Sequence, residues 1–139
     1  MPYPEMLVAP MRAQLENVGF KSLMSASEVE NTLSTKQGTQ LVVFNSVCGC
    51  AAGTGRPGVI DAVSTTSKMP SELLTVFAGQ EPDAVAKARE FTLPYPPSSP
   101  SIALFKDGNL VHFIERHMIE GRSAEMISSN LKAAFDEYC

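Results

Sequence analysis

The chain has 139 residues, a formal net charge of −4 and hydrophobic side chains at 44% of its positions. This is enough apolar material for one domain over residues 1–139 without added staples. Acidic and basic residues are interspersed, so neither a nucleic acid nor a membrane surface is an expected partner. No apolar run approaches the roughly 20 residues that cross a bilayer, and no secretory signal pattern is present, so we expect a cytoplasmic protein.

Apolar periodicity and turn signals predict alternating helices and strands. The expected elements are, in chain order, helix 5–18, a helix from the capping box Ser25–Glu28 to near Gly38, strand 40–45, helix 51–66, strand 73–78, helix 81–91, strand 101–105, strand 110–114 and a helix opened by Ser123. Asp107-Gly108 is a two-residue hairpin signal between the last two strands. The proline-rich segment 93–100 predicts a rigid loop before them.

Cys48-Gly49-Cys50 lies between the first predicted buried strand and the helix that follows it. The strand fixes the position of this turn. The free N–H groups and the positive dipole end of the helix favour a thiolate, which is the reactive form of cysteine. Because a thiolate is the nucleophile of disulfide exchange, the motif predicts thiol–disulfide chemistry.

The spacing of the two cysteines favours a labile disulfide over a structural one. Residues two apart in an extended chain are separated by up to about 7 Å, whereas a disulfide joins Cα atoms at about 4.4–6.8 Å. Gly49 lets the backbone bend, but so small a ring stays strained and is easily reduced. The chain has three cysteines, an odd number that fits thiols kept reduced between reactions better than a secreted disulfide framework.

The order of the elements predicts an α/β fold, with a central mixed four-stranded sheet flanked by helices and additional helices at the N-terminal end. This order resembles that of thioredoxin-like proteins, in which a cis-proline lies beside the redox cysteines. Pro100 directly precedes the strand that begins at Ser101. We therefore predict that the Ser99–Pro100 bond is cis, although X-Pro bonds in general are mostly trans.

Motifs spread over nearly the whole chain resemble those of the bacilliredoxin family. They are Asn45–Gly53 around the two cysteines, Phe77–Gln80, Pro97–Ser101, Val111–Ile114 leading to Arg116–His117, and the terminal Cys139. The resemblance implies a thioredoxin-like enzyme that removes bacillithiol from mixed disulfides with client proteins and acts as a weak disulfide isomerase. It also implies bacillithiol as a co-substrate, bacillithiol-modified proteins as partners and no bound cofactor.

By the same resemblance, Cys48 is the attacking thiolate and Cys50 is the second redox thiol. The residues alone also favour Cys48, as the more exposed end of the turn, but leave the reverse order open. After the attack, either a free thiol or Cys50 removes bacillithiol from Cys48. Both routes remain open at this point.

Other side chains are candidates for supporting roles. Histidine titrates near neutrality, so His117 is a candidate proton shuttle, and Arg56 and Arg116 are candidate partners for a thiolate or for carboxylates of a thiol substrate. A solvated position is the alternative for all three. Cys139 is either a bystander at a frayed terminus or a resolving or dimer-forming thiol. His112 alternates with core residues and is expected to face outward.

Two other classes of protein also use a Cys-x-Cys motif. A metal or iron–sulfur carrier would use Cys48, Cys50 and Cys139, but a tetrahedral site needs a fourth ligand, and His112 or His117 would have to come from a distant segment. A non-catalytic thioredoxin-like adaptor would hold the pair as an inert feature. Its thiols would then alkylate slowly, which separates it from an enzyme.

Overall fold

The computed structural model describes residues 3–47 and 49–139, apart from the side chains of residues 49–52. Cys48 and the side chain of Cys50 therefore lie outside the described residues, and the backbone of Gly49 and Cys50 lies within them. The surroundings of the motif are described from both sides, by the strand that leads to it and the helix that follows.

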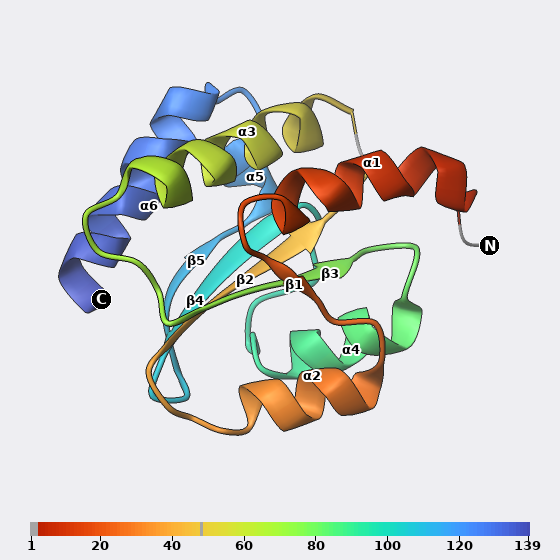
Figure 1. Cartoon of the computed structure of the whole chain (residues 1–139), viewed down its shortest axis with the longest axis horizontal. Coiled ribbons are helices and arrows are strands. Elements are labelled where there is room, and N and C mark those ends of the chain that lie inside the picture. Colours follow the sequence, from red (N-terminus) through yellow and green to blue (C-terminus); the bar gives the residue numbers. More distant parts are fainter. Residues whose placement is uncertain (1–2, 48) are drawn as a thin grey trace.

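A five-stranded mixed sheet lies at the centre of the described structure, in the order β1-β3-β2-β4-β5 (Figure 1). Its strands are β1 Lys21–Ser22, β2 Thr39–Asn45, β3 Glu72–Phe77, β4 Ser101–Lys106 and β5 Asn109–Ile114. The central strand β2 pairs parallel with β3 and antiparallel with β4. Every residue of β2 is buried, as expected for a strand that is covered on both faces.

The sequence predicts four of these strands, and the sheet contains a fifth. Strand β1 has only two residues, Lys21 and Ser22, which pair in parallel with Leu74 and Thr75 of β3. Two residues are too few to show the alternation that reveals a strand in a sequence. The predicted mixed sheet flanked by helices is correct, and the predicted strand number is one too low.

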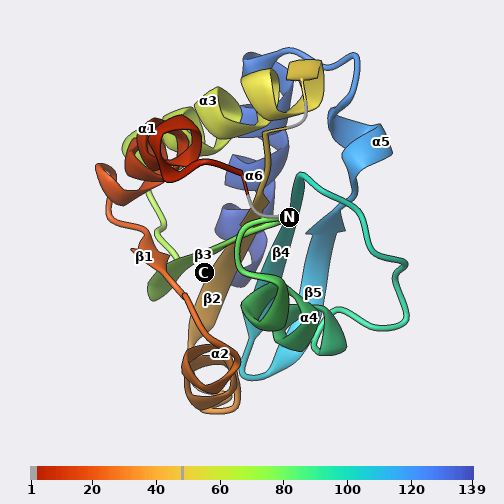
Figure 2. The same ribbon diagram turned by 90° about the vertical axis from the view of Figure 1, so that its right-hand side faces the viewer.

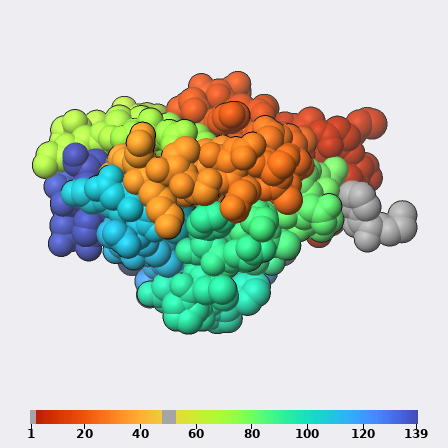
Figure 3. Space-filling model, turned by 90° about the horizontal axis from the view of Figure 1, so that it is seen from below, coloured from red at the N-terminus to blue at the C-terminus, as the bar shows by residue number. Residues whose placement is uncertain are grey.

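Helices cover both faces of the sheet (Figures 1 and 2). They are α1 Glu5–Glu16, α2 Ala26–Leu33, α3 Gly49–Thr65, α4 Pro82–Glu90, α5 Arg116–Ile119 and α6 Ala124–Tyr138. Helices α1, α3, α5 and α6 share one hydrophobic core with the sheet, and α2 and α4 share the other. Figure 3 shows α2 beside the segment that contains α4 on this second face. In the described part of the chain, no helix is both long and apolar enough to cross a membrane.

The two cores explain why the β2 sequence is continuously apolar. Leu41 and Val43 point into the core formed with α1, α3 and α6. Val42 and Phe44 point into the core formed with α2 and α4. Each such side chain contributes about 1.5–3 kcal/mol when it is fully buried. The end of β2, where the cysteine motif follows, is therefore held firmly between two packed layers.

Two helices begin at the residues that the sequence predicts. The hydroxyl oxygen of Ser25 accepts a hydrogen bond of 3.2 Å from the Glu28 N–H, and the Glu28 carboxylate accepts one of 3.2 Å from the Met24 N–H. Ser123 accepts a bond of 3.2 Å from the Met126 N–H at the start of α6. Both serines satisfy N–H groups that lack a partner within their helices.

The predicted hairpin between β4 and β5 is also present. Asp107 and Gly108 have φ angles of 50° and 86°, as a two-residue hairpin turn with positive φ at both positions requires. The carboxylate of Asp107 accepts a hydrogen bond of 3.0 Å from the Gly38 N–H. This bond joins the hairpin to the loop that precedes β2.

Helices α3 and α6 run side by side in the same direction. The Ser128 hydroxyl donates to a carboxylate oxygen of Asp61 at 2.5 Å, and the Lys132 ammonium donates to the Thr65 hydroxyl at 3.2 Å. The C-terminal end of α6 therefore lies beside the C-terminal end of α3. The cysteine motif is at the other end of α3.

Candidate redox site

The candidate site lies where β2 ends and α3 begins. β2 ends at Asn45 and α3 begins at Gly49, so the backbone of Cys50 belongs to the first turn of the helix. This is two residues earlier than the sequence predicts, and Pro57 lies inside the helix without ending it. N–H groups in a first helical turn lack intrahelical acceptors and favour anions, including thiolates. The predicted strand–turn–helix setting of the motif is therefore confirmed for its described neighbours.

Asn45 fixes the backbone at the end of β2. Its side chain is buried, with a relative exposure of 1% for the residue. Its amide nitrogen donates to the Met11 carbonyl in α1 at 3.2 Å, and its amide oxygen accepts from the Ser46 N–H at 2.9 Å and from Arg56 at 3.0 Å. A buried amide with these partners holds the strand end in one orientation, because each lost bond would leave a desolvated polar group.

Arg56 joins three elements around the same point. Its Nη1 atom donates to the Ser46 carbonyl at 2.6 Å as well as to Asn45, and its Nε atom donates to the Gln14 side chain in α1 at 3.1 Å. Burial lowers the pKa of Arg56, although an arginine remains protonated at any physiological pH. The sequence marks Arg56 only as a possible partner for an anion and gives no sign of these contacts.

Pro100 packs beside the second turn of α3. A Cβ atom placed on Gly55 would lie 3.9 Å from Cγ of Pro100 and 3.7 Å from Cγ2 of Ile119 in α5. The Ser99–Pro100 bond is cis, as predicted, and so is the Leu93–Pro94 bond, which was not predicted. The structure thus brings Pro100 close to the helix that carries the cysteine motif.

Arg116 holds the peptide that precedes Pro100. Its Nη1 atom donates to the Ser99 carbonyl at 3.3 Å, and its backbone N–H donates to the Ser98 hydroxyl at 3.4 Å. Its Nε atom donates to the carboxylate of Glu120 at 2.5 Å. Sequence analysis identifies Arg116 as a candidate partner of a thiolate or a substrate, and the described contacts are to the chain itself.

The two histidines lie in different settings. The side chain of His117 is 74% exposed, and its Nε2 atom is 3.9 Å from the carboxylate of Glu115, as expected for a solvated loop histidine. Nε2 of His112 is 2.6 Å from the amide oxygen of Asn130 in α6, so His112 is only partly exposed and has a defined partner. The described contacts place neither imidazole against the start of α3.

Cys139 is a free, exposed thiol at the end of α6. Because α3 and α6 run in parallel, this end lies near Thr65, and the 15 residues from Cys50 to Thr65 span about 22 Å of helix. The three cysteines of one chain are therefore not brought together, which removes the ligand set of the metal-carrier alternative. Among the residues that are described, no group of three or more histidine, cysteine or acidic side chains is arranged to hold a metal ion.

A surface pocket of about 200 Å³ lies between β5, α5 and α6. It is lined by Ile114, Met118, Arg122, Met126, Ile127 and Asn130. These side chains carry no thiol and no group that exchanges a proton near neutral pH. We therefore assign the redox chemistry to the start of α3 and not to this pocket.

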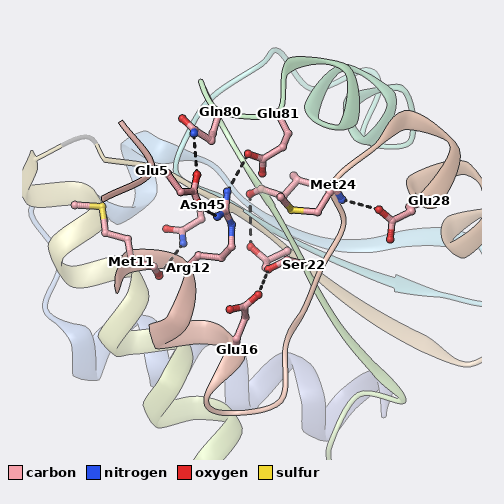
Figure 4. Close-up of polar contacts among 12 residues, drawn as sticks. Glu5, Met11, Arg12, Glu16, Ser22, Met24, Glu28, Asn45, Gln80 and Glu81 are labelled. Atoms are coloured by element: carbon pink, nitrogen blue, oxygen red, sulfur yellow. Dashed lines mark hydrogen bonds and ion pairs between the residues drawn. The ribbon is translucent and has the colours of Figure 1, made fainter. Parts of the chain in front are cut away.

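A buried ion-pair cluster anchors α1, the helix that supplies Met11 and Gln14 to the site (Figure 4). Arg12 is paired with the Glu5 carboxylate and donates to Glu81, next to α4, at 2.9 Å. Its guanidinium carbon lies 5.7 Å from the centroid of the Phe77 ring. The i, i+7 spacing of Glu5 and Arg12 is visible in the sequence, but the contact with Glu81 is not, because it spans 69 residues.

This cluster predicts how stability depends on pH. Burial raises the pKa of Glu81, and the nearby Arg12 opposes that rise without cancelling it. Between the ordinary value of 4.5 and the raised value, the folded state binds more protons than the unfolded state, so the contribution of Glu81 to stability falls as pH rises through this window. Wild type should therefore lose stability relative to Glu81→Gln over the same interval.

The measurement is the free energy of unfolding by denaturant at several pH values between 4 and 8, for both proteins. Glu30→Gln, at an exposed position of α2, controls for the loss of one negative charge. If wild type instead gains stability relative to Glu81→Gln as pH rises, the ion pair with Arg12 outweighs burial and the assignment is wrong.

Comparisons with known proteins agree with this site. A family model described as disulphide isomerase matches residues 3–139. The chain is 62% identical to a bacilliredoxin of Cytophaga hutchinsonii over 135 residues, covering 97% of this chain and 98% of the relative. It is 51% identical to a bacilliredoxin of Bacillus licheniformis over 137 residues, covering 99% and 95%.

Solved structures show the same fold at low sequence identity. Thioredoxin of Fasciola hepatica is 13% identical with a TM-score of 0.57, and the match covers 86% of this chain and all of that one. Thioredoxin of Plasmodium falciparum is 22% identical with a TM-score of 0.57, covering 86% and 98%. The predicted thioredoxin-like fold is therefore confirmed.

Proposed function

The chain belongs to the bacilliredoxin family of thiol–disulfide oxidoreductases, and we propose that it removes bacillithiol from mixed disulfides with client proteins. The observation that carries this proposal is the position of Cys48-Gly49-Cys50 between the buried end of β2 and the first turn of α3. Pro100 packs one turn further along that helix. The relatives named bacilliredoxin supply the substrate class.

In the proposed first step, the Cys48 thiolate attacks the bacillithiol sulfur of the mixed disulfide. A disulfide forms between Cys48 and bacillithiol, the client–bacillithiol bond breaks, and the client leaves as a thiolate that takes a proton from water. The start of α3 favours the attacking thiolate through its free N–H groups. No metal or bound cofactor takes part in this step.

The second step clears bacillithiol from Cys48 by one of two routes. A second molecule of bacillithiol attacks the adduct and leaves as bacillithiol disulfide, which returns Cys48 to the thiolate. Alternatively, the Cys50 thiolate attacks Cys48, releases bacillithiol and leaves an internal disulfide, which two equivalents of a low-molecular-weight thiol then reduce. Both routes need a supply of reduced thiol, so we place the reaction in the cytoplasm.

We also propose a weak disulfide isomerase activity. The description of the family model supports it, and a Cys-Gly-Cys disulfide closes a small ring that is readily reduced. A thiol pair of this kind attacks a non-native disulfide and leaves again, so the client can rearrange. This activity requires only the same two thiols.

The test is the rate at which the enzyme frees the thiol of one client protein, modified in parallel with bacillithiol and with glutathione. We expect release from bacillithiol to be at least about tenfold faster, the discrimination that a few substrate contacts supply. A scrambled disulfide-bonded protein measures the isomerase activity in the same preparation. Equal rates for the two adducts would contradict bacillithiol specificity and leave a general oxidoreductase.

A further inference from the structure

Arg56 carries a positive charge that no acidic side chain balances. Its partners, each on a different segment, are the Gln14 side chain in α1, the Asn45 side chain at the end of β2 and the carbonyl of Ser46. All three are neutral. Within residues 3–47 and 49–139, no carboxylate forms an ion pair with Arg56.

Arg12 shows how this chain treats another buried arginine. It lies on the adjacent helix α1 and is paired with two carboxylates, Glu5 and Glu81. Arg56 is half-buried and lacks such compensation, and burial lowers its pKa. A cation in a poorly solvated position without an acidic partner favours any anion that forms nearby, since its field is less screened there than in water.

The contacts of Arg56 point to the anion concerned. The guanidinium donates at 2.6 Å to Ser46, which precedes Cys48 by two residues. It also donates to Asn45, whose amide oxygen accepts the Ser46 N–H. One side chain thus fixes both polar groups of the Ser46 backbone, directly or through Asn45. A guanidinium suits this task because its planar fork donates to several acceptors in a fixed geometry.

We propose that Arg56 is a positioning residue that holds the segment before Cys48 in place and favours the thiolate form of the motif. This inference rests on the proposed function, in which that thiolate is the nucleophile. It assigns to Arg56 a structural contact and an electrostatic effect, and no direct contact with the substrate.

The test is the pH dependence of Cys48 alkylation by iodoacetamide in the reduced full-length protein, followed by peptide mass mapping. Arg56→Gln removes the charge and should raise the midpoint by about 1 pH unit. Arg56→Lys keeps the charge but loses the planar fork, so its midpoint should lie between those of wild type and Arg56→Gln. Lys68→Gln removes an equal charge near the far end of α3, where Lys68 donates to the Asp136 carbonyl, and should leave the midpoint unchanged.

An unchanged midpoint in folded Arg56→Gln would overturn the inference. Circular dichroism and a thermal midpoint establish folding for each variant. If Arg56→Gln does not fold, Arg56→Lys decides the matter, because a wild-type midpoint and rate in that variant would exclude the positioning role. If wild-type Cys48 itself shows no thiolate near neutral pH, the proposed function fails, so the two failures are distinguishable.

Discussion

Cys48→Ser should lower the rate of client-thiol release by about a thousandfold or more, because the serine hydroxyl is not ionised near neutral pH and provides no comparable nucleophile. The measurement is release of the client thiol from a bacillithiol-modified protein under steady-state conditions. Cys139→Ser is the matched control. Its thiol lies at the far end of α6 from the motif, so the rate should be unchanged.

Cys50→Ser separates the two routes that clear bacillithiol from Cys48. Complete loss of turnover in this variant would exclude the route in which a second bacillithiol regenerates the enzyme. Full retention of turnover would make the internal disulfide dispensable. If Cys48→Ser keeps most of its activity while Cys50→Ser loses it, the attacking thiol has been assigned to the wrong cysteine.

Gly58→Ala should lower the free energy of unfolding by about 2 kcal/mol, within the range for overpacked cores. An added Cβ atom would lie 2.7 Å from both Cβ and Cγ2 of Ile127 and 3.1 Å from the Ala124 carbonyl oxygen in α6. Neither the branched Cβ of Ile127 nor a helix backbone can move away without shifting α6. This clash should outweigh the roughly 1 kcal/mol that alanine gains over glycine inside a helix.

Gly53→Ala is the control for this substitution within the same helix. A Cβ atom at Gly53 would meet nothing within 4 Å, so this variant should be more stable than wild type by about 0.5–1 kcal/mol. Denaturant unfolding of both variants gives the comparison. If Gly58→Ala proves at least as stable as Gly53→Ala, α3 and α6 do not pack as closely as described.

The regular part of the fold is predictable from the sequence because its signals are local. The apolar run at 40–45, the capping serines Ser25 and Ser123 and the Asp107-Gly108 turn each act through near neighbours in the chain, and the structure confirms all of them. β1 and α5 have two and four residues, which is too short for periodicity to show.

The candidate site divides along the same line. The strand–turn–helix setting of the cysteine motif is visible in the sequence, because strand, motif and helix are adjacent in the chain. The contacts of Arg56 with Gln14 and of Arg12 with Glu81 span 42 and 69 residues. Such pairs depend on how the helices pack against the sheet, and a single sequence carries no signal for them.

The central claim is that Cys48 takes bacillithiol from a client protein. The most direct test is the intact mass of Cys50→Ser after mixing with one equivalent of a bacillithiol-modified client, with metal analysis of the purified protein. The account predicts one bacillithiol adduct, located at Cys48 by peptide mapping, an equivalent of free client thiol and no stoichiometric metal. An unmodified Cys48 beside an intact client adduct, or one metal ion per chain with unreactive thiols, would contradict it.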